Sequence, residues 1–231
     1  MLLKQLSTSN KQKTKLFKPN FPNIKMNIFQ LLKKFWAYLK QDTWHSWIVS
    51  LILLYIAIRW ILFPLMSLIT GTPLPLVVVE SCSMYHSSDI DSWWDQNAAW
   101  YESRNISKSD FAEFNMKNGL NKGDILFVWG YSKSYELGDI IIFLPNSESA
   151  APNPIIHRIV TKNPIGTKGD NGLTNPYQLS RDNNINNLDE TSISGDRIIG
   201  KAQFKVIPFA GWIKLIWFEP FRSESQRGFC K

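Results

Sequence analysis

Apolar residues are distributed unevenly along this chain of 231 residues. Residues 47–69 form an apolar run that contains one charged side chain, Arg59, and one proline, Pro64. At about 1.5 Å per residue, a helix over this run reaches roughly 34 Å, which is enough to cross a hydrocarbon core about 30 Å thick. A buried core helix is the alternative, but apolar runs this long are rare in soluble folds. We therefore predict a transmembrane helix over residues 47–69.

The segment before this run shows helical periodicity with a polar face. Its apolar residues at helical spacing are Ile28, Leu31, Leu32, Phe35, Trp36 and Leu39. This pattern predicts an amphipathic helix within residues 27–46, which lies on a membrane interface or packs on a partner protein. Residues 1–26 are polar, rich in lysine and aperiodic, and are expected to be disordered.

After residue 70 the pattern changes to short runs rich in Val, Ile and Phe, most of them opened by turn residues. The predicted strands are residues 76–79, 124–129, 139–144, 155–160, 197–206 and 212–218. Strands do not alternate with helices, so a doubly wound parallel sheet is excluded. We predict a mostly β domain of small antiparallel sheets over residues 70–231. Residues 85–121 interrupt it as an insertion, with helices expected around 89–103 and 107–115.

Charge separates the N-terminal segment from the rest of the chain. The formal net charge is +7. Residues 1–46 hold nine lysines and one acid, so the remaining residues sum to −1. A basic segment on a neutral body does not suggest a nucleic-acid partner; it suggests the lipid bilayer and a topology signal. The positive-inside rule places the N-terminus in the cytoplasm and residues after 70 on the other side.

The two cysteines, Cys82 and Cys230, offer no metal-binding pattern. The chain has no CxxC pair and no cluster of Cys and His, so no metal site is expected. Nothing in the spacing of the two residues requires a bridge, and we expect two free thiols.

Two serines follow the first predicted strand. Ser81 and Ser83 are two residues apart, so in extended chain their side chains point to the same side. Ser83 could act as a nucleophile, with a second hydroxyl near the oxyanion that forms. A solvated turn would explain the same residues, so this signal is weak by itself.

A histidine and two turn segments supply the other candidate groups. His157 lies within a predicted strand, where it is either a core histidine with a satisfied hydrogen bond or a general base. Residues 167–171 and 179–183 contain Asp170 and Asp182 in turn-forming sequence. A carboxylate from either segment could orient the imidazole and stabilise its charged form.

Taken together and in order, these segments resemble type I signal peptidases over roughly residues 47–218. The resemblance rests on a membrane anchor followed by five short motifs: Ser81-Cys82-Ser83-Met84, Gly138-Asp139-Ile140, His157-Arg158, Gly169-Asp170-Asn171 and Ile198-Ile199-Gly200-Lys201. Bacterial enzymes of this family carry Lys before the Arg, whereas archaeal and endoplasmic-reticulum enzymes carry His. The chain is therefore similar to the archaeal and endoplasmic-reticulum branch.

The resemblance implies a Ser/His/Asp site with Ser83 as nucleophile and His157 as base. The Ser81 hydroxyl and the Ser83 backbone N–H would bind the oxyanion. His86 stands where the family has proline, a change expected to be tolerated. The family position of the orienting Asp falls on residues 176–177, which are not acidic.

Three aspartates are then the candidates for contact with the base. We expect Asp182 to orient the imidazole, with Asp189 as the next choice. Asp170, inside its motif, is expected to be a second essential carboxylate. The division of roles among them stays open.

The implied activity is that of a membrane-anchored serine endopeptidase that removes signal peptides from exported preproteins, without metal or cofactor. The substrate would pair with an exposed strand edge over residues 75–81 on the outer or lumenal face. Protein-export machinery is an expected partner. A non-catalytic membrane-anchored β module of the same ancestry is the alternative. A self-cleaving protease of the repressor type is a third option, opposed by the apolar run and by His157.

Overall fold

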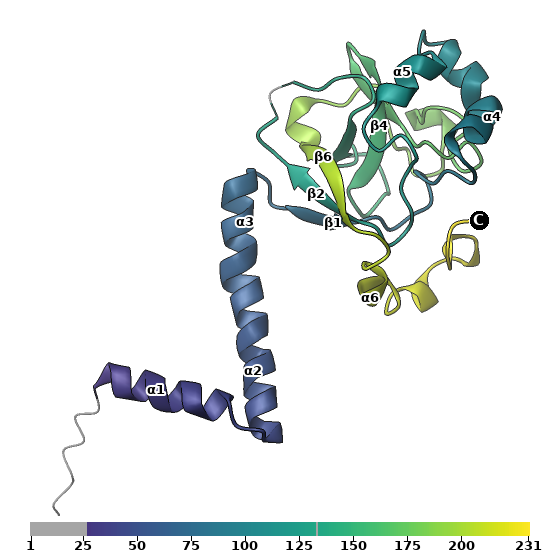
Figure 1. Cartoon of the computed structure of the whole chain (residues 1–231). Coiled ribbons are helices and arrows are strands. Elements are labelled where there is room, and N and C mark those ends of the chain that lie inside the picture. Colours follow the sequence, from purple (N-terminus) through teal and green to yellow (C-terminus); the bar gives the residue numbers. More distant parts are fainter. Residues whose placement is uncertain (1–26, 133) are drawn as a thin grey trace, which may run out of the picture. The chain divides into compact units, whose positions relative to one another are not determined.

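The computed structural model describes residues 27–132 and 134–231 (Figure 1). The chain divides into two units, Met1–Tyr55 and Ile56–Lys231. In the first unit, α1 spans Ile28–Leu39 and α2 begins at Trp44. The helix α1 lies within the segment predicted to be amphipathic. The expected disordered tail, residues 1–26, lies outside the described residues.

A single long helix covers the predicted transmembrane run. It consists of α2 (Trp44–Ala57), a π-helical segment (Ile58–Leu62) and α3 (Phe63–Thr70). Its 27 residues are long and apolar enough to cross a membrane. Pro64 does not end the helix: it occupies the first turn of α3, directly after the π-helical segment, where its missing N–H is accommodated. The helix ends at Thr70, before Gly71 in the left-handed conformation.

The second unit is built on one antiparallel sheet. Its strands are β1 (Leu76–Val78), β2 (Ile125–Trp129), β3 (Ile140–Phe143), β4 (Ile155–Lys162), β5 (Ile165–Lys168) and β6 (Ile198–Ile207). They lie in the order β1-β2-β6-β3-β4-β5, which leaves β1 and β5 as the edges. The prediction of a mostly antiparallel β fold with one long apolar helix is confirmed, although the strands join one curled sheet rather than several small ones.

Two local predictions differ from the structure. Residues 212–218 do not form a strand: α6 (Trp212–Leu215) is a short helix followed by turns. The apolar residues Ile213, Ile216 and Trp217 are spaced as on one face of a helix, a periodicity that a run of seven residues with six apolar or aromatic members obscured. Strand β5 was not predicted, because its residues include Gly166 and Lys168 and lack an apolar alternation.

The insertion at residues 85–121 is helical and packs against the sheet through aromatic side chains. It contains α4 (Ile90–Glu102) and α5 (Lys108–Glu113), close to the predicted helices. Each begins at a side-chain cap, Asp89 for α4 and Ser107 for α5. A buried cluster joins the insertion to β4: Trp93, Trp94, Tyr101, Ile106, Phe111 and Val160. The insertion is therefore part of the packed body.

Candidate active site

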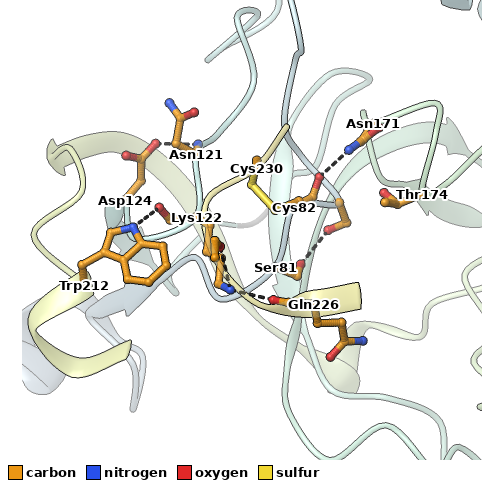
Figure 2. Close-up of a disulfide and its surroundings, with 12 residues drawn as sticks. Ser81, Cys82, Asn121, Lys122, Asp124, Asn171, Thr174, Trp212, Gln226 and Cys230 are labelled. Atoms are coloured by element: carbon orange, nitrogen blue, oxygen red, sulfur yellow. Dashed lines mark hydrogen bonds between the residues drawn. A yellow bond between two sulfur atoms is a disulfide. The ribbon is translucent and has the colours of Figure 1, made fainter. Parts of the chain in front are cut away.

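The candidate nucleophile lies in a loop directly after the edge strand β1. The hydroxyl oxygens of Ser81 and Ser83 are 3.0 Å apart. Two hydrogen bonds from Asn171 hold this loop: its side chain donates to the Cys82 carbonyl at 2.9 Å (Figure 2), and its backbone N–H donates to the Ser83 carbonyl at 2.8 Å. Asn171 belongs to the Gly-Asp-Asn motif and follows β5, so the motif anchors the serine loop to the opposite edge strand.

Gly169 makes this close approach feasible. A Cβ at this position would lie 2.7 Å from the Ser83 carbonyl oxygen, closer than real side chains approach. Glycine therefore suits the position because it lets the chain after β5 pass against the serine loop.

The candidate base, His157, lies on β4 with 4% of its surface exposed. Its Nδ1 contacts the carboxylate of Glu190, which is fully buried. The backbone of Glu190 is fixed as well, since its N–H donates to the Leu179 carbonyl at 3.0 Å and its carbonyl accepts from the Thr167 N–H at 2.9 Å. The Thr167 hydroxyl also donates to Oε1 of Glu190 at 3.2 Å. Because these contacts fix the position of the Glu190 carboxylate, it can hold the imidazole of His157 in one orientation.

The expectation that Asp182 contacts His157 is wrong in this structure. Asp182 is exposed in a short 3-10 helix, and among the described residues its carboxylate makes no hydrogen bond or ion pair. Asp189 faces away from the base as well: its carboxylate accepts from the Thr191 hydroxyl at 2.6 Å and pairs with Arg181 at 3.4 Å. The contact falls instead to the neighbouring Glu190, which is fully buried.

The sequence holds one local signal for Glu190: it stands two residues after Leu188, so in extended chain the two side chains share a face. Both are buried in the structure, whereas Asp189 between them is half-buried. An acid at an inward-facing position of such a segment needs a partner, because an unpaired buried carboxylate is costly. The family resemblance implies an aspartate at this place, so it does not point to a glutamate.

Asp170 lies at the centre of a different buried cluster, which links the serine loop to β4. Arg158 donates to it from Nε at 3.0 Å and from Nη2 at 2.6 Å. His86 Nε2 lies 3.2 Å from the same carboxylate. Burial by itself would raise the pKa of Asp170, but the Arg158 guanidinium and His86 outweigh that effect and hold the pKa well below its usual range.

Arg158 connects this cluster to the insertion at residues 85–121. Its guanidinium also donates to the carbonyls of Asn115 (2.8 Å), Met116 (3.1 Å) and Gly138 (2.8 Å). Because His157 and Arg158 are neighbours in a strand, their side chains point to opposite faces and reach different carboxylates. Asp170 therefore organises the packing around the site, and it is Glu190 that contacts the imidazole.

His86, at the position of the family's proline, is buried and has contacts that proline could not make. Its ring stacks on Trp93 of the insertion, with ring centroids 3.9 Å apart and planes 4° apart. It also bonds Asp170, as described above. The substitution thus brings a side chain that ties the loop after Ser83 to α4.

The candidate groups lie on three segments, and the contacts that connect the candidate nucleophile with the candidate base run through β5 and the chain after it. Thr167 contacts the partner of His157, and Asn171 contacts the serine loop. Among the described residues, Ser83 Oγ bonds Ser81 and does not bond His157. Catalytic hydrogen bonds are often long before substrate binds and shorten in the complex.

Lys168 is a second buried basic group at the end of β5. Its ammonium donates to the Gly169 carbonyl at 2.8 Å and lies over the rings of Trp100 and Tyr101, at 4.9 and 5.4 Å from their centroids. Burial lowers the pKa of Lys168 to about 8, even though Asp170 and Glu190 partly oppose the shift.

The expectation of two free thiols is wrong. Cys82 and Cys230 form a disulfide across 148 residues of sequence (Figure 2). Such a separation carries no spacing signal, so the pairing could not be read from the sequence. Within the described residues, no group of three or more Cys, His, Asp or Glu side chains could hold a metal ion.

Comparison with curated proteins finds similarity to catalytic subunits of one kind of complex, whereas no family model matches the chain. The chain is 28% identical over 112 residues to the signal peptidase complex catalytic subunit sec11 of Pyrenophora tritici-repentis. The match covers 45% of this chain and 59% of the relative. The corresponding subunit of Komagataella phaffii is 29% identical over 75 residues, covering 28% of this chain and 42% of the relative.

A third relative extends the same pattern. The signal peptidase complex catalytic subunit SEC11 of Eremothecium gossypii is 31% identical over 71 residues, which are 28% of this chain and 41% of the relative. The chain spans about half the length of the curated relatives it matches.

Proposed function

The chain has homologues among type I signal peptidases of the endoplasmic-reticulum kind, and from this kinship we propose that it is a membrane-anchored serine endopeptidase that cleaves signal peptides from exported preproteins. The observation that carries the proposal is the contact between the buried His157 on β4 and the buried carboxylate of Glu190. The edge strand β1 of the same sheet leads into the pair Ser81 and Ser83. A core histidine satisfied by a backbone carbonyl would not need a fully buried acid beside it.

In the proposed mechanism, His157 removes the proton from Ser83 Oγ as that oxygen attacks the scissile carbonyl. Glu190 holds the imidazole through Nδ1 and stabilises it when it becomes charged. His157 then protonates the leaving amine, and water releases the acyl group from Ser83 by the reverse sequence.

The developing oxyanion requires donors at the serine loop. We assign this role to the Ser83 backbone N–H and the Ser81 hydroxyl. The two bonds from Asn171 hold the carbonyls of residues 82 and 83 and thereby orient the peptide planes of the loop. Preorganised donors of this kind commonly contribute a factor of about 10²–10³ to kcat.

The edge strand β1 is the proposed binding surface for the extended cleavage segment. Val79 pairs with the loop before β2, since its N–H donates to Asp124 and its carbonyl accepts from Gly123. By alternation, the backbone groups of Leu76 and Val78 face the open edge. A preprotein strand that pairs there would lead its scissile bond towards Ser83.

The disulfide supports placing residues after 70 on the exported side. Disulfides persist in oxidising compartments and are rare in the cytosol. The lysine-rich segment before the long helix favours the same orientation by the positive-inside rule. The anchor would then hold the site where signal peptides leave the membrane. A role beside protein-export machinery belongs to the same proposal.

The test is cleavage of a purified preprotein by the full-length chain in detergent micelles, with the product identified by N-terminal sequencing. Ser83→Ala should lower kcat by at least about 10⁴-fold. Ser87→Ala, an exposed serine in the same segment, is the matched control and should cleave normally. Undiminished cleavage by Ser83→Ala would overturn the proposed function. A wild-type chain that never cleaves would favour the non-catalytic module.

A further inference from the structure

The C-terminal segment returns to the candidate nucleophile and bonds the chain on both sides of Ser81. Cys230 is joined to Cys82, the residue between the two active-site serines (Figure 2). Glu80, directly before Ser81, is bonded by Lys214 at 2.8 Å and by Arg222 at 2.9 Å. We call residues 211–231 the C-terminal clamp.

Glu80 forms ion pairs with two basic side chains of the clamp. Burial by itself would raise the pKa of Glu80, but Lys214 and Arg222 outweigh burial and lower the pKa. Arg222 also lies 3.2 Å from Glu219 within the clamp. One carboxylate in front of the serine loop therefore holds two cations that are eight residues apart in the clamp.

Lys122 is the centre of the second contact. Its side chain is fully buried, and its ammonium pairs with Glu219 at 2.7 Å. It also donates to the carbonyls of Gln226 at 2.7 Å (Figure 2) and Gly228 at 3.1 Å. All three partners belong to the clamp. A buried ammonium with such a partner set is stable only while the clamp is in place, because unpairing it would leave a buried charge.

Lys122 also connects the clamp to the serine loop through the backbone. Its carbonyl accepts from the Trp212 indole at 3.0 Å, and Phe229 packs on that indole with ring centroids 4.4 Å apart. The next residue, Gly123, donates to the Val79 carbonyl at 2.8 Å, and Leu120 donates to the Met84 carbonyl at 2.7 Å. The segment 120–123 thus lies between the clamp and both ends of the serine loop.

From these contacts we infer that the C-terminal clamp positions the nucleophile, so that full peptidase activity requires the Cys82–Cys230 disulfide. This inference rests on the proposed function. Glu80, Lys122 and Cys230 are positioning residues: they act through the backbone that carries Ser81 and Ser83, whose hydroxyls must stay aligned for attack and for oxyanion binding.

Reduction is the chemical step by which the clamp would be released. A small dithiol attacks the bridge by thiol–disulfide exchange, leaves the thiols of Cys82 and Cys230, and is itself oxidised to a cyclic disulfide. Two electrons and two protons pass from the dithiol to the protein. The reverse exchange, with an oxidised dithiol as acceptor, restores the bridge.

The test uses the full chain in micelles with two readouts, preprotein cleavage and backbone hydrogen exchange of residues 79–86. For Cys230→Ser we expect kcat to fall on the order of 10²-fold with KM nearly unchanged, because a misplacement of about 1 Å costs that much. Exchange in residues 79–86 should become faster. Dithiothreitol should lower the wild-type kcat to the same level, reversibly, and leave the kcat of Cys230→Ser unchanged.

A second pair of variants keeps the test decisive if Cys230→Ser does not fold. Lys122→Met removes the buried ammonium, whereas Lys162→Met removes an exposed lysine that pairs with Glu136. We expect slower kcat and faster exchange only for Lys122→Met. An unchanged kcat and unchanged exchange in folded Lys122→Met and in the reduced wild type would overturn the inference. If the wild type cleaves no preprotein, the proposed function fails, and the exchange rates still decide whether the clamp orders the serine loop.

Discussion

Two buried carboxylates, Asp170 and Glu190, differ in their partners and therefore in what their loss should do. Asp170 pairs with a fully buried arginine and with His86, whereas Glu190 contacts the imidazole of His157. The first arrangement joins three segments of the fold. The second fixes one side chain in the candidate site. Replacing Asp170 should therefore lower the stability of the fold, whereas replacing Glu190 should lower activity.

For Asp170→Asn we expect a loss of about 3–5 kcal/mol in the free energy of unfolding, because the Arg158 guanidinium would remain buried without its counter-charge. Urea denaturation in micelles measures this loss. Asp182→Asn, at an exposed position, should stay within about 0.5 kcal/mol of the wild type. Equal stabilities of the two variants would refute the structural role of Asp170.

Lys168 gives a prediction about pH. Its pKa is about 8 in the folded chain and 10.5 as the ordinary value, so between these values the unfolded chain holds more protons. The free energy of unfolding should therefore rise with pH across this window, by at most about 1.4 kcal/mol per pH unit. Lys168→Met should remove that contribution. Denaturation at pH 7, 8.5 and 10 gives the difference between wild type and variant, and a difference that does not change with pH would contradict the prediction.

At the scale of elements, the pattern of apolar residues was enough for most of the fold. The long helix, five of the six strands and both insertion helices were predicted close to their observed positions. Strand β5 was not predicted because Gly166 and Lys168 suit contacts with the neighbours of β5, namely the backbone carbonyl of Glu190 and the aromatic rings of α4. Tertiary contacts of this kind leave no local periodicity.

Candidate site residues could be predicted where a reactive side chain lies in or directly after a predicted strand. They could not be predicted where their role depends on contacts between residues far apart in sequence. Ser83 and His157 were proposed from their motifs. Glu190 and Asn171 were not assigned roles, since each acts on a residue far away in sequence. The sequence therefore supplied the candidate serine and histidine, and the structure identified Glu190 as the carboxylate that contacts the histidine.

The open edge of β1 carries an element-level prediction. Val78→Pro removes an N–H that faces outward, so it should raise KM for a preprotein and leave the stability almost unchanged. Val77, which pairs with Leu126 of β2, is the matched position: Val77→Pro should remove a bond within the sheet and destabilise the chain. Steady-state cleavage and thermal unfolding of the two variants provide the measurements. A KM unaffected by Val78→Pro would exclude β1 as the substrate edge.

For the whole molecule, the topology proposal predicts which residues are accessible on each side of a membrane. The two native cysteines are paired, so a single introduced cysteine reports its own position. In sealed vesicles whose lumen is the exported side, a membrane-impermeant maleimide should label Gln41→Cys directly. It should label Ser147→Cys only after detergent is added. The opposite pattern would reverse the proposed orientation.

The central claim is that a serine peptidase site is formed by Ser83 and by His157 under the control of Glu190. Its most direct test compares preprotein cleavage by Glu190→Gln and Asp182→Asn, two changes of an acid to its amide. We predict that Glu190→Gln lowers kcat by about 10⁴-fold, because the imidazole loses the carboxylate that fixes its tautomer, and that Asp182→Asn cleaves like the wild type. Full activity of Glu190→Gln together with an inactive Asp182→Asn would contradict the account.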